Sequence, residues 1–147
     1  MSSRLSRNEL FFETARLYGR RSSCPRAQVG VIAIRDGRIT AAGYVGAPRG
    51  MPHCLDVGCF IENEGCIRSV HAEANMVAWA AREGIPLKGT DVFCTHLPCL
   101  ACAKLLANAG IASLFYEQPY RDSRGGALLQ ELGVKITRLM MVSPYES

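Results

Sequence analysis

Three residues with metal-binding side chains, His71, Cys99 and Cys102, have a spacing that suits a catalytic zinc ion. Two cysteines three positions apart at the start of a helix direct both thiolates to one side. The helix N-terminus favours the thiolate form, because its free N–H groups attract negative charge. A catalytic zinc ion keeps three protein ligands and leaves one position open, whereas structural zinc sites are closed. We therefore expect these three residues to hold a catalytic ion rather than a purely structural one.

Glu73 follows His71 by two positions, which places a carboxylate near the ion without making it a ligand. Zinc lowers the pKa of a bound water to about 7, so the carboxylate is able to take its proton and pass it on. The order His-x-Glu and then Pro-Cys-x-x-Cys is the signature of zinc deaminases. Here it reads His71-Ala72-Glu73 and Pro98 to Cys102. The sequence thus predicts a hydrolytic deaminase with Glu73 as the catalytic acid and base.

From about Glu9 to Asp122 the chain resembles the deoxycytidylate deaminase family of the cytidine deaminase superfamily. Besides the zinc motif, the resemblance rests on four segments: residues 24–30, 36–39, 43–50 and 95–99. It implies an α/β fold, the cytidine deaminase-like three-layer α/β/α arrangement with a five-stranded mixed sheet. It also implies conversion of dCMP to dUMP with release of ammonia, a nucleotide effector, and a homo-oligomer, either a hexamer or a dimer.

One position departs from the family pattern, because this chain has Val45 where the family usually has asparagine. The resemblance implies that the asparagine hydrogen-bonds the sugar hydroxyl of the substrate, and Val45 offers no such group. Two interpretations stay open. Either another residue holds the sugar and dCMP remains the substrate, or the substrate is a different amino-pyrimidine or amino-heterocycle.

Several residues are candidates for the lining of the substrate pocket. They are Arg26, Val45, Ala72, Pro98 and Tyr120. The resemblance places a tyrosine near the base at the position of Tyr120. Arg26 and Arg49 are candidates for binding a phosphate or an effector nucleotide, since a guanidinium group matches phosphate oxygens. For both arginines an exposed surface charge is the alternative, and His96 is either a pocket residue or a structural one.

Four further cysteines fall outside the motif: Cys24, Cys54, Cys59 and Cys66. Some relatives hold a second, structural zinc in this region, and the resemblance places two of its ligands at Cys24 and Cys54. Four thiolates would form a closed tetrahedral site, in which His53 is a candidate to replace one cysteine. The alternative is that they are buried thiols, which are common in protein cores. Cys94 lies in the middle of a predicted strand and is expected in the core.

The elements that position these residues follow from hydrophobic periodicity and turn signals. Ser6-Arg7-Asn8-Glu9 has the form of a capping box and predicts a helix that runs to Gly19. Asp36-Gly37 predicts a hairpin turn. The remaining pattern predicts strands at 28–34, 38–44, 90–96, 112–117 and 134–140, helices at 71–82, 99–109 and 126–132, and an irregular loop over 45–69. Strands that alternate with helices predict a mixed sheet with helices on its faces.

Length and composition limit the remaining choices. The chain of 147 residues, 48% hydrophobic and 20% charged, fits a single domain over residues 1–147. It has neither a secretory signal nor the roughly 20 apolar residues of a membrane helix, so we expect a cytoplasmic protein. In that compartment thiols stay reduced, and seven cysteines favour metal binding. A net charge of +4 without a basic tract suits an anionic small molecule as the substrate. A nucleic-acid deaminase and a non-catalytic zinc protein are less favoured alternatives.

Overall fold

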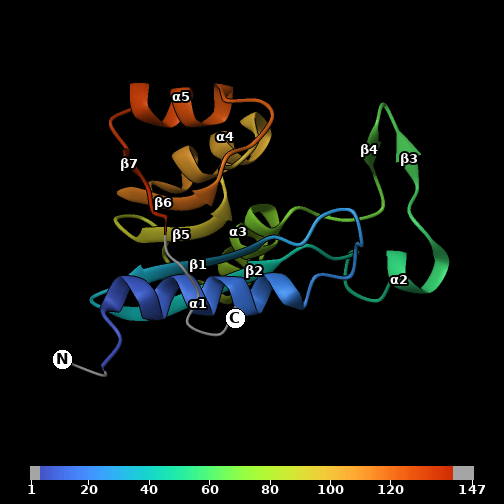
Figure 1. Ribbon diagram of the computed structural model, residues 1–147, viewed down its shortest axis with the longest axis horizontal. Coiled ribbons are helices and arrows are strands. Elements are labelled where there is room, and N and C mark those ends of the chain that lie inside the picture. Colours follow the sequence, from blue (N-terminus) through green and yellow to red (C-terminus); the bar gives the residue numbers. More distant parts are fainter. Residues whose placement is uncertain (1–3, 141–147) are drawn as a thin grey trace.

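In the computed structural model, which describes residues 4–140, helices cover both faces of one five-stranded sheet (Figure 1). The strands are β1 (Gly30–Arg35), β2 (Arg38–Tyr44), β5 (Asp91–His96), β6 (Ser113–Gln118) and β7 (Lys135–Arg138). They lie in the order β2-β1-β5-β6-β7. The β1–β2 and β1–β5 pairs are antiparallel, while β5–β6 and β6–β7 are parallel. The predicted mixed five-stranded sheet is therefore confirmed.

The helices are divided unequally between the two faces of the sheet. Helix α1 (Arg7–Arg20) packs alone on one face, against β1 and β5. Helices α3 (Ala72–Glu83), α4 (Leu100–Ala109) and α5 (Arg124–Glu131) form the opposite layer, with α4 between the other two. This arrangement is the three-layer α/β/α architecture expected from the sequence.

Side chains of β1 and β5 supply the core on both faces, because alternate residues of a strand point to opposite sides. Ile32 and Phe93 face α1, where Phe93 packs against the ring of Phe12 with centroids 5.3 Å apart. Val31 and Cys94 face the α3–α4 layer. Strands buried on both faces become almost continuously apolar, which explains the Val- and Ile-rich sequence of β1.

A glycine sets the distance between α3 and the sheet. A Cβ atom on Gly43 in β2 would overlap the carbonyl oxygen of Ala72 and lie 2.9 Å from the backbone nitrogen of Met76. Only glycine lets the two backbones approach this closely. The first turn of α3, which carries Glu73, is consequently held beside the end of β2.

The segment 45–69 is not irregular throughout, so that expectation was wrong in part. It contains a short helix α2 (Cys54–Val57) and a hairpin of β3 (Ile61–Glu62) and β4 (Gly65–Cys66). Figure 1 shows this hairpin projecting from the side of the molecule, away from the five-stranded sheet. Asn63 and Glu64 turn the chain with φ angles of 49° and 66°, as a two-residue hairpin turn requires. Two-residue strands are too short to show an alternating pattern in the sequence.

The other predicted elements match the structure to within about two residues at each end. The capping box is present at α1: Glu9 N donates to Ser6 Oγ over 3.1 Å, and Ser6 N donates to Glu9 Oε2 over 2.6 Å. Helices α3 and α4 both end at glycines in the left-handed conformation, Gly84 and Gly110. Among the helices within residues 4–140, none has the length and apolar character needed to cross a membrane.

Candidate active site

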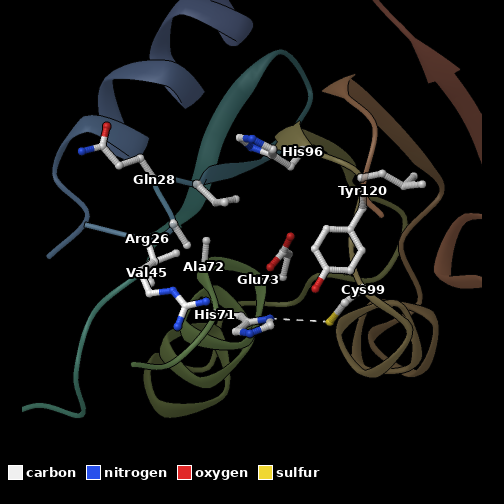
Figure 2. Close-up of a pocket in the computed structure, with 12 residues that line it drawn as sticks. Arg26, Gln28, Val45, His71, Ala72, Glu73, His96, Cys99 and Tyr120 are labelled. Carbon is white, nitrogen blue, oxygen red and sulfur yellow. Dashed lines mark hydrogen bonds between the residues drawn. The ribbon is translucent and has the colours of Figure 1, made fainter. Parts of the chain in front are cut away.

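The N-termini of α3 and α4 bring the three predicted zinc ligands together. His71 is the N-cap of α3, Cys99 is the N-cap of α4, and Cys102 lies in the first turn of α4. His71 Nδ1 is 3.5 Å from the sulfur atoms of both Cys99 and Cys102 (Figure 2 draws the contact with Cys99). Tetrahedral zinc with ordinary bond lengths separates a nitrogen and a sulfur ligand by about 3.6 Å. The three side chains therefore fit a zinc ion as they stand.

Charge in this cluster is concentrated on Cys99. The hydrogen bond from the Cys102 thiol, followed by that from His71, lowers the pKa of Cys99 to about 4. The contact with Cys99 in turn raises the pKa of His71, and raises that of the buried Cys102 thiol. One thiolate is thus already favoured before a cation enters, and a divalent cation would favour the second, because zinc binds cysteine as thiolate.

Glu73 lies in the first turn of α3 and is only 4% exposed. Burial raises the pKa of its carboxyl group above the ordinary value. Figure 2 shows the carboxylate directed into the pocket, between the ring of Tyr120 and the side of the pocket that carries Arg26 and Val45. A carboxyl group with a raised pKa, close to the reacting atoms, suits proton transfer near neutral pH.

A cavity of about 260 Å³ is lined by Glu73 and by two of the predicted ligands, His71 and Cys99. Four of the five predicted pocket residues line it: Arg26, Val45, Ala72 and Tyr120. Pro98 is the exception, because its side chain is fully buried and lies outside the cavity lining. His96 lines the cavity with its Nδ1 atom 2.9 Å from Thr95 Oγ1, and burial lowers its pKa. Gln28 also lines the cavity, although it was not among the predicted pocket residues.

Hydrogen bonds from Ser23 and Asn75 hold the backbone around Val45. Ser23 N donates to the Val45 carbonyl oxygen over 3.0 Å. The amide of Asn75 donates to the carbonyl oxygens of Tyr44 over 2.8 Å and Val70 over 3.4 Å. The Val45 side chain itself is 3% exposed and forms part of the cavity wall. An apolar side chain therefore occupies the position at which the family pattern has an amide.

A second cavity, of about 300 Å³, adjoins the first and shares Arg26, Val45, His71 and Tyr120 with it. Two guanidinium groups border this cavity. Arg26 Nη2 donates to the carbonyl oxygen of Glu64 over 3.0 Å, and the Arg121 guanidinium lies 5.7 Å from the centre of the Tyr120 ring. Sequence reasoning missed Arg121, although its position next to Tyr120 was an available signal.

Arg49 is not brought to either of these cavities. It lines a separate surface hollow together with Asn75 and Trp79. Arg26 and Arg49, both candidates for binding a phosphate or an effector nucleotide, therefore lie in different surroundings.

The remaining cysteines form a second cluster, at the base of the β3–β4 hairpin. The sulfur atoms of Cys24, Cys54, Cys59 and Cys66 all lie within 4.8 Å of one another. The Cys54–Cys66 and Cys24–Cys59 separations are 3.5 and 3.8 Å. Tetrahedral zinc holds two thiolates about 3.8 Å apart, so these four residues fit a closed zinc site. His53 lies outside the cluster, with its Nδ1 atom 2.6 Å from Ser23 Oγ.

Comparison with known proteins agrees with this geometry. The family described as "Cytidine and deoxycytidylate deaminase zinc-binding region" matches residues 5–118. The chain is 35% identical to ComE operon protein 2 of Bacillus subtilis, over 92% of this chain and 72% of that protein. It is 32% identical to the deoxycytidylate deaminase of Saccharomyces cerevisiae, over 90% of this chain but only 45% of the yeast enzyme.

A solved structure shows the same likeness in three dimensions. The dCMP deaminase of cyanophage S-TIM5, in complex with dCMP and dUMP, superposes with a TM-score of 0.82 and 34% identity. The match covers 90% of this chain and 96% of the phage chain. Fold and site define a zinc-binding α/β hydrolase of the cytidine deaminase type. Within that class, this chain belongs to the cytidine and deoxycytidylate deaminase family.

Proposed function

We propose that this protein is a zinc-dependent deaminase that converts dCMP to dUMP and releases ammonia. The observation that carries the proposal is that Glu73 lines one cavity together with His71 and Cys99, which form a candidate metal site with Cys102. The similarity to dCMP deaminases over nearly the whole described chain supports dCMP as the substrate. The same similarity disfavours a different amino-pyrimidine or amino-heterocycle.

The residues of the cavity have distinct roles in this reaction. A zinc ion held by His71, Cys99 and Cys102 would supply an activated water as the nucleophile. Glu73 accepts a proton from the attacking water and delivers protons to the ring nitrogen and to the departing amine. Burial of Glu73 keeps bulk water away from these transfers, which strengthens its interaction with the developing charges.

Other residues hold the nucleotide. Tyr120 offers an aromatic face to the base at the side of the cavity opposite Val45 (Figure 2). Arg26 and Arg121 border the adjoining cavity and are the cations available to the phosphate group. Ala72 contributes backbone and a small side chain beside Glu73, whereas the buried Pro98 shapes the start of α4 without touching substrate. A nucleotide effector near Arg49 stays a prediction.

Because Val45 stands where the family pattern has asparagine, the choice of substrate is tested with the natural chain and the variant Val45→Asn. We expect dCMP to have the highest kcat/KM in a steady-state assay of dCMP, deoxycytidine, cytosine and other amino-heterocycles. Val45→Asn should change kcat/KM for dCMP by less than about tenfold, because one neutral hydrogen bond contributes about 1 kcal/mol. Superior turnover of another compound by the natural chain, together with a large gain for dCMP in Val45→Asn, would establish the alternative substrate instead.

We also propose a second, structural zinc ion at Cys24, Cys54, Cys59 and Cys66. Its support is the tetrahedral spacing of the four sulfur atoms and their origin in separate parts of the chain. A closed site of four thiolates has no open position for a substrate. Its role is to hold the β3–β4 hairpin beside the cavity that Arg26 and Arg121 border.

For the whole protein we propose a single domain, residues 1–147, that works in the cytoplasm as a homo-oligomer. The two apolar clusters of the core meet at strands β1 and β5, which supports one folding unit. Large apolar side chains are exposed on the segment that carries the second cysteine cluster: Leu55, Val57, Phe60, Ile61 and Ile67. Such a group of exposed apolar residues supports association with another copy.

A further inference from the structure

We propose that Cys94 is a positioning residue for the reaction: its thiol orients the Glu73 carboxylate. This inference rests on the proposed deaminase function. The Cys94 sulfur donates a hydrogen bond to Glu73 Oε1 over 3.2 Å. Cys94 belongs neither to the predicted zinc ligands nor to the second cysteine cluster, and the sequence predicts only a core residue there.

The surroundings of Cys94 hold its side chain in a rigid position. Cys94 is fully buried in β5, the central strand of the sheet. It pairs with Val31 of β1 on one side and with Tyr116 of β6 on the other. Its side chain points toward the α3 layer, where Glu73 lies in the first turn of the helix. A donor anchored in the middle of a sheet moves less than one placed on a loop, as a positioning group requires.

The predicted zinc ligands near Glu73 are unsuitable for this task once zinc is bound. Cys99 and Cys102 would then be thiolates, which have no proton to donate. His71 would use its Nδ1 atom as a ligand, since that nitrogen faces both sulfurs. Cys94 is not a ligand, so it keeps its proton and its hydrogen bond to Oε1.

The expected effect of this contact falls on turnover rather than on binding. The terminal torsion of a glutamate side chain is broad, so an untethered carboxylate would sample several orientations. The bond to Oε1 ties one oxygen to the sheet and leaves the other for proton transfer. Misplacing a catalytic group lowers the rate of the chemical step, whereas substrate affinity depends on other residues.

Three variants of the zinc-loaded, full-length enzyme test the proposal by kcat and KM for dCMP. Cys94→Val removes the donor and leaves an apolar side chain that is one heavy atom larger; it should lower kcat about tenfold while KM stays within about twofold. Cys94→Ser keeps a donor and should restore kcat to within about threefold of the natural enzyme. Val92→Ala is the matched control, because Val92 is equally buried on the same face of β5, whereas the hydrogen bond to Glu73 comes from Cys94.

The control should lower the melting temperature and leave kcat unchanged. Unchanged kcat in Cys94→Val, or a Cys94→Ser variant as slow as Cys94→Val, overturns the positioning role. A fall of kcat in Val92→Ala equal to that in Cys94→Val would also overturn it, because packing alone would then explain both. If the natural enzyme does not deaminate dCMP at all, the proposed function fails first, and this inference fails with it.

Discussion

At the scale of single residues, the buried position of Glu73 lowers the stability of the fold but suits proton transfer. A buried carboxylate is costly unless it is hydrogen-bonded or placed near a compensating charge. Glu73 receives the hydrogen bond of Cys94, and its buried position raises its pKa. A zinc ion at the neighbouring ligands would add the compensating positive charge. This combination is expected of a group that must bind and release protons.

The isosteric variant Glu73→Gln tests this role. It keeps the shape of the side chain but is unable to accept a proton, so kcat should fall by about 10²- to 10⁴-fold. Zinc content, measured by plasma mass spectrometry, and the melting temperature should stay near those of the natural protein. Loss of metal and fold together in this variant would instead mean that Glu73 is structural.

At the scale of elements, the site depends on how closely two backbones approach. Helix α3 carries His71 at its N-cap and Glu73 in its first turn, and it packs against β2 through Gly43. The same contact holds the end of β2, where Val45 enters the cavity wall. One helix–strand contact therefore positions the predicted ligand His71, the predicted acid–base group Glu73 and the Val45 side of the cavity wall.

We expect Gly43→Ala to destabilise the fold by about 1–3 kcal/mol, because the added Cβ would overlap backbone atoms that have no room to move. Thermal unfolding should show a melting temperature several degrees lower, and kcat should fall as α3 is displaced. Gly65→Ala is the matched control: its Cβ would lie 3.8 Å from the nearest heavy atom, the Glu62 oxygen. Equal melting temperatures for both variants would contradict the close approach at Gly43.

At the scale of the whole molecule, the second cysteine cluster joins distant parts of the chain. Cys24 follows α1, Cys54 begins α2, and Cys66 ends the hairpin that projects from the sheet (Figure 1). This hairpin has only two residues in each strand, and an isolated hairpin has little stability of its own. A metal ion at the cluster would therefore determine whether this side of the substrate cavity keeps its shape.

Metal analysis of the fully loaded protein should give two zinc ions per chain, and Cys66→Ser should reduce this to one. In that variant KM for dCMP should rise, because Arg26 is held by the hairpin through Glu64. Limited proteolysis should cleave the variant within 45–69 before the natural protein. Cys94→Ser, which changes a cysteine outside both clusters, should keep two ions. A single zinc ion in the loaded natural protein would rule out the second site.

The sequence by itself determined the chemistry and the order of the elements. Ligand types, the spacing of the two motif cysteines and the helix boundaries are local properties, so the pattern alone predicts His71, Cys99 and Cys102 as ligands and Glu73 as the acid and base. Hydrophobic periodicity likewise predicted the strands of the mixed sheet, which the structure confirmed. The short β3–β4 hairpin was not predicted from the sequence, because its strands have too few residues to form an alternating pattern.

Only the tertiary structure decided which distant side chains meet. The contact of Cys94 with Glu73 joins β5 to α3. Arg121, in the loop after β6, borders the same cavity as residues of the β3–β4 hairpin. Pro98 belongs to the motif but is buried in the core, and Arg49 lies at a different hollow from Arg26. Local sequence fixes the chemical type and spacing of side chains, whereas packing of the sheet and helices fixes their direction and their neighbours.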